Sequence, residues 1–310
     1  MRYTLRQLEY FVAAGEAGSI RSASDKLSIS QPSISTAISH LEIEFGVQLF
    51  VRHHAQGLSL TGAGQTLLAE AKRVISMAEN LHALAAETTG QVRGLLGVGA
   101  MITLAPMIMP ELAYNFRQNF PASEIRQVAA NHESLGEKLS KAEIDLVISY
   151  DLPLPPGIAF EPLASLPPHA LVARSHRLAE MEEVTLEELA ADPLILLDLP
   201  LSRHYFNELY EREGLRPNVY ARAAEQEIVR TMVANGYGYT LANVRPRSDR
   251  ALDGKRLVRL RLRGDHRPMV IGMAMRQGER QSRLLEHFIL HCRASISDQT
   301  IPGMCPLDEG

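Results

Sequence analysis

Residues 19–41 read SIRSASDKLSISQPSISTAISHL, a pattern typical of two short helices joined by a tight polar turn. Apolar residues recur every three or four positions in both halves, so each predicted helix has one apolar side. Ser30 occupies the position of a helix N-cap, and Pro32 falls in the first turn, where a missing N–H costs no helical hydrogen bond. The second helix is therefore expected to begin near Gln31.

The side of this second helix that faces away from its apolar stripe carries short hydrogen-bonding side chains, which can approach DNA base edges and phosphates. Periodicity alone equally fits any small helical protein with a polar surface. The flanking chain favours the DNA-binding interpretation, because residues 4–15 predict a preceding helix with a capping-box start and residues 46–61 predict a two-stranded wing. The candidate DNA-facing residues are Gln31, Ser33, Ser35, Thr36, Ser39 and His40.

Residues 5–64 resemble the DNA-binding end of the LysR-type transcriptional regulators. The resemblance rests on the runs LRQLEYFVAAGEAGSI, SQP, LEIEFGVQLFVR and LSLTGAG. It implies a winged helix-turn-helix domain over residues 1–60, here called the head, that binds double-stranded DNA. It also implies recognition-helix contacts and a wing contact, which fall in this chain on Gln31, Pro32, Ser33, Ser35 and, in the wing, Arg52.

The head carries five basic and five acidic residues, so its net charge is zero with histidine neutral. Many family members have basic residues at the positions of Thr36 and of Ala55 or Gln56, where this chain is neutral. Each neutralised phosphate adds about 0.9 to the slope of log affinity against log salt, so we expect a shallow slope per protomer. His54, with its neighbour His53, would add charge only below about pH 6.5, although an ordinary solvated role is favoured for both.

Residues 61–90 predict one long linker helix, rich in Ala, Leu and Glu and free of Pro. Its apolar residues alternate in steps of four and three, the heptad spacing of a helix that pairs with another helix. Leaving an apolar stripe in water costs about 25 cal/mol per Å², so we expect the helix to pair with a second protomer. The alternative is burial of the stripe against the effector domain of the same chain. A two-fold dimer would match an inverted-repeat operator. The predicted seam is Leu67, Ala71, Val74, Ala78, Leu81 and Ala85.

From about residue 92, strand and helix patterns alternate, which predicts parallel sheets covered by helices. The predicted fold class is α/β with an N-terminal all-α winged helix-turn-helix, a long linker helix and two Rossmann-like α/β subdomains of periplasmic-binding-protein type. The resemblance places subdomain I at 91–163 and 268–297 and subdomain II at 164–267, together an effector-binding domain over 91–297. Residues 298–310 have little periodicity and are expected to form a disordered tail.

Ligands of open α/β sheets bind at the carboxyl ends of strands, often against helix N-termini. Arg203 and Arg245 could hold a carboxylate there, so a small organic anion is the expected effector. Asp198 would oppose an anion unless an arginine pairs with it, and each candidate taken alone fits a loop or capping role equally well. The candidates for effector binding are Met101, Thr103, His132, Ser149, Tyr150, Ser202, Arg203, Gln226, Asn243 and Arg245.

Signatures of other protein classes are weak. The run GVGAMI has Ile102 where a dinucleotide-binding loop needs its third glycine, and there is no GxSxG, so we expect neither an enzyme nor a cofactor. His287 and His291 lie one helical turn apart beside Cys292, but a solvated helix face is favoured over a metal site. The two cysteines lack disulfide spacing, and no apolar run is long enough for export or for crossing a membrane.

The sequence thus predicts a sequence-specific transcriptional regulator that is modulated by a small molecule bound between two α/β subdomains. The alternatives are a solute-binding or sensor protein and an α/β enzyme with an accessory helical domain. A solute-binding protein would have no use for residues 1–60. The resemblance further implies a homodimer, a homotetramer built from two dimers, and a bacterial cytoplasm; RNA polymerase is a further candidate partner.

Overall fold

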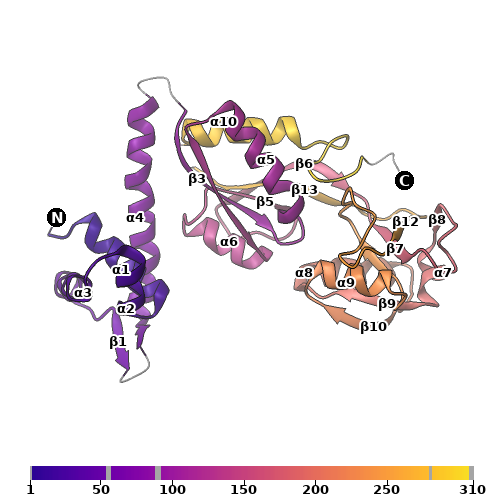
Figure 1. Ribbon diagram of the computed structural model, residues 1–310, viewed down its shortest axis with the longest axis horizontal. Coiled ribbons are helices and arrows are strands. Elements are labelled where there is room, and N and C mark those ends of the chain that lie inside the picture. The colour runs from indigo at the N-terminus through magenta and orange to yellow at the C-terminus, as the bar shows by residue number, and fades with distance from the viewer. Residues whose placement is uncertain (1, 54–56, 88–91, 279–280, 307–310) are drawn as a thin grey trace.

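In the computed structural model the chain forms a helical head, a long helix and an α/β part with two sheet regions (Figure 1). The structure describes residues 2–53, 57–87, 92–278 and 281–306. None of the helices within these ranges is long and apolar enough to span a membrane. The parts follow each other in the order that the sequence predicts, with the head first and the two sheet regions after the long helix.

The head contains three helices and a hairpin. Each helix has a side-chain cap at its start. Thr4 forms a capping box with Gln7 and Ser30 accepts the backbone N–H of Ser33, as the sequence predicts, and Ser19 caps α2 in the same way. The apolar stripes meet in a common core that includes Phe11 and Ile34. The elements are α1 (Leu5–Ala17), α2 (Ile20–Leu27), α3 (Gln31–Phe45), β1 (Phe50–His53) and β2 (Gly57–Leu60).

The long helix α4 (Gly62–Glu87) leaves the head and runs alongside the first sheet region (Figure 1). Its first turns pack on the head, where Ala71 is buried and Leu67 is partly buried. These two seam residues therefore have a packing partner within the chain that the sequence analysis does not foresee. Val74 and Met77 remain 42% and 67% exposed. The side chains of Leu81 and Ala85 lie outside the described residues.

Subdomain I is built on a five-stranded sheet of order β4-β3-β5-β13-β6. Strands β3, β4 and β5 are parallel, and β13 is antiparallel to β5 and β6, so the sheet is mixed. Helices α5 and α10 share one core, where Phe116 packs edge-on against Phe288, and α6 belongs to a separate core with Leu135 and Val147. The bounds are β3 (Gly94–Met101), α5 (Ala105–Asn119), β4 (Ser123–Ala130), α6 (His132–Ser140), β5 (Leu146–Tyr150), β6 (Ile158–Leu166), β13 (Met269–Arg276) and α10 (Arg283–Ser295).

Subdomain II contains a four-stranded sheet of order β11-β7-β12-β8 and a parallel pair of β10 and β9. A bridge between Leu194 and Tyr239 joins the pair to the start of β11. The chain crosses between the subdomains from β6 to β7 and from β12 to β13. The sequence analysis missed β6, β8 and β12 as strands. The bounds are β7 (His169–Ala173), β8 (Glu183–Val184), α7 (Leu186–Ala190), β9 (Pro193–Leu197), α8 (Pro200–Arg212), β10 (Asn218–Ala223), α9 (Gln226–Ala234), β11 (Thr240–Ala242) and β12 (Leu257–Leu262).

The segment after α10 is packed, where the sequence predicts disorder from residue 298. Ile301 and Met304 are buried. The backbone N–H of Gly303 donates to Glu111 of α5 at 3.1 Å, and Cys305 N–H donates to the carbonyl of Arg245 at 2.9 Å. Residues 297–305 thus connect subdomain I with the segment that follows β11. Residues 307–310 lie outside the described part of the chain.

Candidate DNA-reading helix and effector cavity

Helix α3 has one side fixed in the head and one side free. Ile34, Ile38 and Leu41 are fully or almost fully buried. At the helix start, the Ser30 hydroxyl lies 2.7 Å from the Ser33 hydroxyl and also accepts the Ser33 backbone N–H. This arrangement leaves the first turn open to solvent, the end that approaches bases in helix-turn-helix proteins. Of the predicted DNA-facing residues, Ser35 and Ser39 are half-buried, and the exposed ones are Gln31, Pro32, Ser33 and Thr36.

His40, which the sequence places on the same outward side, is held by the head itself. Its Nδ1 lies 3.3 Å from Gln7 Nε2 of α1, and the ring is half-buried. The helical period alone could not reveal this contact, because Gln7 precedes His40 by more than thirty residues. His40 therefore takes part in the packing between α1 and α3, in addition to lying on the outward side of the helix.

The wing follows α3 directly. Phe50 pairs with Leu60 and Arg52 with Leu58 in the antiparallel hairpin. The Glu42 carboxylate on α3 accepts the backbone N–H groups of Leu49 and Phe50, so it ties the reading helix to the wing. The side chain of Arg52 and all of His54 lie outside the described residues.

Five of the ten predicted effector residues line one cavity between the two subdomains. Thr103 and Tyr150 come from the ends of β3 and β5 in subdomain I, and their hydroxyls are 3.1 Å apart. The other three, from subdomain II, are Ser202, Gln226 and Asn243. The carboxyl ends of strands and the helix starts that follow them thus meet across the gap, as expected for open α/β sheets.

Several polar groups of this cavity already form hydrogen bonds within the protein. Asn243 Nδ2 donates to the carbonyl of Leu166 at 2.8 Å and to the Tyr205 hydroxyl at 3.2 Å. Burial raises the pKa of Tyr150 far above its usual range, so its hydroxyl stays protonated. Gln226 Oε1 is buried without a hydrogen-bond partner in the structure, which marks an acceptor available to a ligand or to water.

The other five predicted effector residues do not line the cavity. The Arg203 guanidinium pairs with Asp198 at 2.6 Å, so both arginine and carboxylate are neutralised outside it. Arg245 is buried within the segment that binds the C-terminal tail. His132 hydrogen-bonds Ser149 at 3.0 Å and the carbonyl of Pro153 at 2.8 Å. Met101 is likewise buried away from the cavity, in the core of subdomain I.

Sequence reasoning missed Arg230 and the apolar walls of the cavity. Arg230 lies one turn after Gln226 on α9, so the helical period would have placed it on the same side. Its Nη2 donates to the carbonyls of Ser248 and Arg250, and its Nε lies 3.3 Å from a Glu227 carboxylate oxygen. The apolar walls include Leu171, Phe206, Val229, Leu241 and Met269.

The histidines of α10 have a packing role. His291 Nε2 lies 3.0 Å from the carbonyl of Leu112, and its ring packs against Phe116 and Phe288. The His287 ring packs against Phe120. In the part of the chain that the structure describes, no group of three His, Cys, Asp or Glu side chains is placed to hold a metal ion.

A winged reading helix, a long linker helix and a two-part ligand-binding domain together define a class of protein, the one-component transcriptional regulators. Family comparison gives the same assignment. Residues 5–65 match the family model "Bacterial regulatory helix-turn-helix protein, lysR family", and residues 89–297 match "LysR substrate binding domain".

Individual relatives agree with these matches. The HTH-type transcriptional regulator cbl of Escherichia coli (strain K12) is 27% identical over 291 residues, covering 93% of this chain and 92% of the relative. The crystal structure of HinK, a LysR family transcriptional regulator from Pseudomonas aeruginosa, is 37% identical, with a TM-score of 0.65 over 95% of this chain and 99% of that one. The structure of CbnR complexed with its target DNA has a TM-score of 0.70 at 24% identity, covers 94% of this chain and 99% of that one, and shows the shared fold.

The chain belongs to the LysR family of transcriptional regulators. It is a DNA-binding regulator with an effector-binding domain and not an enzyme.

Proposed function

We propose that a small-molecule effector binds in the cavity between the two subdomains and that this binding controls how the head uses α3 to read an operator. The observation that carries the proposal is the convergence of Thr103 and Tyr150 from subdomain I with Gln226 from subdomain II on one cavity. The unpartnered buried oxygen of Gln226 supports it, because such an atom gains a hydrogen bond when a ligand enters.

Effector binding requires the subdomains to separate. The cavity is only about 30 Å³, enough for one or two water molecules, whereas organic ligands occupy pockets of about 300–1,000 Å³. The two crossings, from β6 to β7 and from β12 to β13, are the natural hinges, since the chain passes between the halves at these two strand connections. The structure therefore corresponds to a closed arrangement that a ligand would open.

The cavity lining favours an organic monoanion with an apolar body. Its walls are mainly apolar, and its hydroxyl and amide groups include those of Thr103, Ser202 and Asn243. Arg230 is the cation among the lining residues that the structure describes, and Glu227 neutralises part of its charge. The carboxylate of an effector would thus be drawn to Arg230, and not to Arg203 or Arg245, which lie outside the cavity.

A homodimer remains the best explanation of the exposed apolar residues of α4. Val74 and Met77 stay accessible in a single chain, whereas Leu67 and Ala71 already pack on the head. A pair of heads related by two-fold symmetry would recognise an inverted repeat in duplex DNA. We further propose that the protein acts together with RNA polymerase in the bacterial cytoplasm. The proposal includes the assembly of two dimers into a tetramer.

Calorimetry of the full-length protein with a series of small carboxylates tests the effector site. Thermal shift would first select carboxylates that raise the unfolding temperature, because a ligand that binds only the folded form stabilises it. Thr103→Val and Gln226→Ala should then weaken binding about tenfold, the effect of losing one to two hydrogen bonds. Arg203→Ala is the matched control, because its guanidinium is paired outside the cavity. Equal losses in all three variants, or a loss only in the control, would refute the site.

Selection of binding sequences from a random pool of duplexes tests the DNA reader. The full-length protein should enrich an inverted repeat, and Ser33→Ala with Gln31→Ala should broaden the base preference at the repeat while general DNA affinity persists. If the variant protein enriches the same sequences as the unsubstituted protein, the first turn of α3 is excluded as the reading surface.

A further inference from the structure

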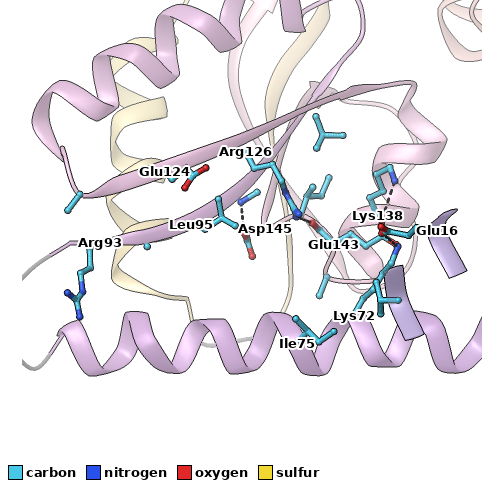
Figure 2. A pocket seen from close by; sticks show the side chains of 17 residues that line it. Glu16, Lys72, Ile75, Arg93, Leu95, Glu124, Arg126, Lys138, Glu143 and Asp145 are labelled. Atoms are coloured by element: carbon cyan, nitrogen blue, oxygen red, sulfur yellow. Dashed lines mark hydrogen bonds and ion pairs between the residues drawn. The ribbon is translucent and has the colours of Figure 1, made fainter. Parts of the chain in front are cut away.

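Four side chains of alternating charge join the head, the linker helix and subdomain I (Figure 2). Glu16 extends from α1, Lys72 from α4, Glu143 from the turn between α6 and β5, and Lys138 from α6. Lys72 Nζ lies 3.1 Å from Glu16 Oε1 and 3.1 Å from Glu143 Oε1, and Lys138 Nζ lies 3.2 Å from Glu143 Oε2. Lys72 therefore touches a carboxylate of the head and one of the effector domain at the same time.

Close packing does not hold these parts together at this place. A cavity of about 830 Å³ separates α4 and α1 from the strands β3 and β4, so the apolar side chains that line it, such as Val12, Ile75 and Leu95, do not close the gap by packing. Its charged lining is balanced, because the cations and carboxylates largely neutralise each other, and so it does not resemble a site for a charged ligand. Where an interface is hollow, dispersion contacts are few and the ionic contacts contribute a larger share of its stability.

The central pair is shielded from solvent more than a surface ion pair. The side chains of Lys72 and Glu143 are 19% and 20% exposed. Burial alone would lower the pKa of Lys72, but its hydrogen bonds and charge interactions with Glu143 and Glu16 raise it above its usual value. Burial likewise opposes ionisation of Glu143, and Lys72 with Lys138 lowers its pKa below the usual value. Both groups are therefore charged near neutral pH.

The position of Glu143 is set by the end of α6. Ala142 adopts a left-handed conformation with φ of 53°, and the Glu143 backbone N–H donates to the carbonyl of Lys138 at 2.9 Å, the pattern of a Schellman terminus. Arg276 of β13 donates to the carbonyls of Leu139 and Ile144 on either side of the turn. The turn is thus part of the rigid body of subdomain I and moves with it.

The same turn leads directly into the sheet that bears Tyr150. Strand β5 begins at Leu146, three residues after Glu143, and ends at Tyr150 in the wall of the cavity between the subdomains. A rotation of subdomain I as a body would therefore move Glu143 relative to Lys72.

We propose that Glu16, Lys72, Glu143 and Lys138 form an interdomain latch, in which the Lys72–Glu143 pair holds the head and subdomain I in one relative arrangement and so sets the affinity of the head for DNA. The latch is independent of where an effector binds, because it rests on contacts within the chain. When the Lys72–Glu143 pair breaks, the head can take other positions relative to the effector domain.

Double electron–electron resonance measures the distance between two spin labels, and so reports the position of the head relative to subdomain I. Labels would be placed at Arg21→Cys on α2 and Asn115→Cys on α5, both exposed, in a Cys305→Ser background in which the remaining Cys292 is buried. Dilution with unlabelled chains restricts the signal to pairs within one chain. Glu143→Gln and Lys72→Met, which keeps most of the aliphatic stem, should shift or broaden the distance distribution. Arg73→Gln is the matched control, because Arg73 pairs with Glu70 on its own helix.

Salt provides a test without substitution. Raising NaCl from about 0.05 M to 1 M shortens the screening length from more than 10 Å to about 3 Å and should move the unsubstituted protein toward the distribution of the variants. An unchanged distribution in both variants and at high salt overturns the latch.

DNA affinity distinguishes the latch from a simple charge effect. The probe is the duplex most enriched by the unsubstituted protein from a random pool. If charge alone mattered, Lys72→Met would weaken binding and Glu143→Gln would strengthen it, because the two changes have opposite signs. The latch predicts a change in the same direction for both, on the order of fivefold, and no further change in the double variant. Opposite directions, additive effects or no effect would overturn it.

Discussion

Glu42 Oε1 accepts the backbone N–H of Leu49 at 2.8 Å, which fixes the end of the reading helix to the first strand of the wing. The same oxygen lies 3.3 Å from the backbone nitrogen of Phe50. A single carboxylate therefore satisfies two main-chain donors at the junction of α3 and β1. Because the wing and the helix would contact neighbouring parts of one DNA site, their relative position matters for recognition as well as for stability.

Replacing Glu42 by Ala should lower the free energy of unfolding of the head by about 1–3 kcal/mol, because two partly buried N–H groups lose a charged acceptor. Glu42→Gln should cost less, since the amide oxygen still accepts. Urea unfolding measures the change, and DNA affinity should fall in parallel. Glu44→Ala serves as control, because the described residues give Glu44 no such main-chain bond. Equal losses at both positions would argue against the junction.

An arginine at position 36 should strengthen DNA binding. Thr36 is exposed on the outward side of α3, and the head has no net charge. One new phosphate contact adds about 0.9 to the slope of log affinity against log salt, so Thr36→Arg should steepen the slope by about one. Binding titrations over a salt series measure it. Gln118→Arg adds the same charge to the exposed side of α5 and should leave the slope unchanged. A steeper slope in both variants would mean that only total charge matters.

The head could be predicted from sequence because its signals are local. The start of α3 is specified within one helical turn, by the cap residue Ser30 and by Pro32. The apolar spacing around Ile34 specifies its buried side in the same local way. The capping box of Thr4 and Gln7 is equally local, and it is present in the structure. The outward residues followed from the same period, but the contact of His40 with Gln7, which belongs to another helix, did not.

The effector cavity could be predicted only in part, because it depends on contacts between distant segments. Thr103 and Gln226, which were chosen as residues at strand ends, do line the cavity between the subdomains. Arg203 was misjudged because its charge is neutralised by Asp198, and pattern alone cannot tell a paired from an unpaired arginine. The packed tail was missed for the same reason, since the partner of Gly303 is Glu111, nearly two hundred residues earlier in the chain.

Replacing Ala142 by Gly should stabilise the protein. The left-handed conformation at Ala142 is one that residues with a β-carbon adopt at a cost of roughly 1 kcal/mol, and glycine adopts it freely. The gain is expected to be about 0.5–1 kcal/mol, because glycine also makes the unfolded chain more flexible. Urea unfolding measures it. Ala122→Gly, at an exposed position without positive φ, should be neutral or destabilising. Destabilisation by Ala142→Gly would show that the turn is not strained.

Folding stability should fall as the pH drops below about 6.5, and His169 should account for part of the fall. Burial holds the pKa of His169 well below its usual 6.5, and the charges of Arg259, Arg245 and Arg230 lower it further. The unfolded chain therefore binds a proton at a pH where the folded chain does not, which destabilises the fold by up to about 1.4 kcal/mol per pH unit. Urea unfolding at pH 7.5 and 5.5 measures the slope. His169→Leu should reduce it, whereas His204→Leu, at an exposed position, should not. An unchanged slope in His169→Leu would mean that this histidine is protonated equally in both states.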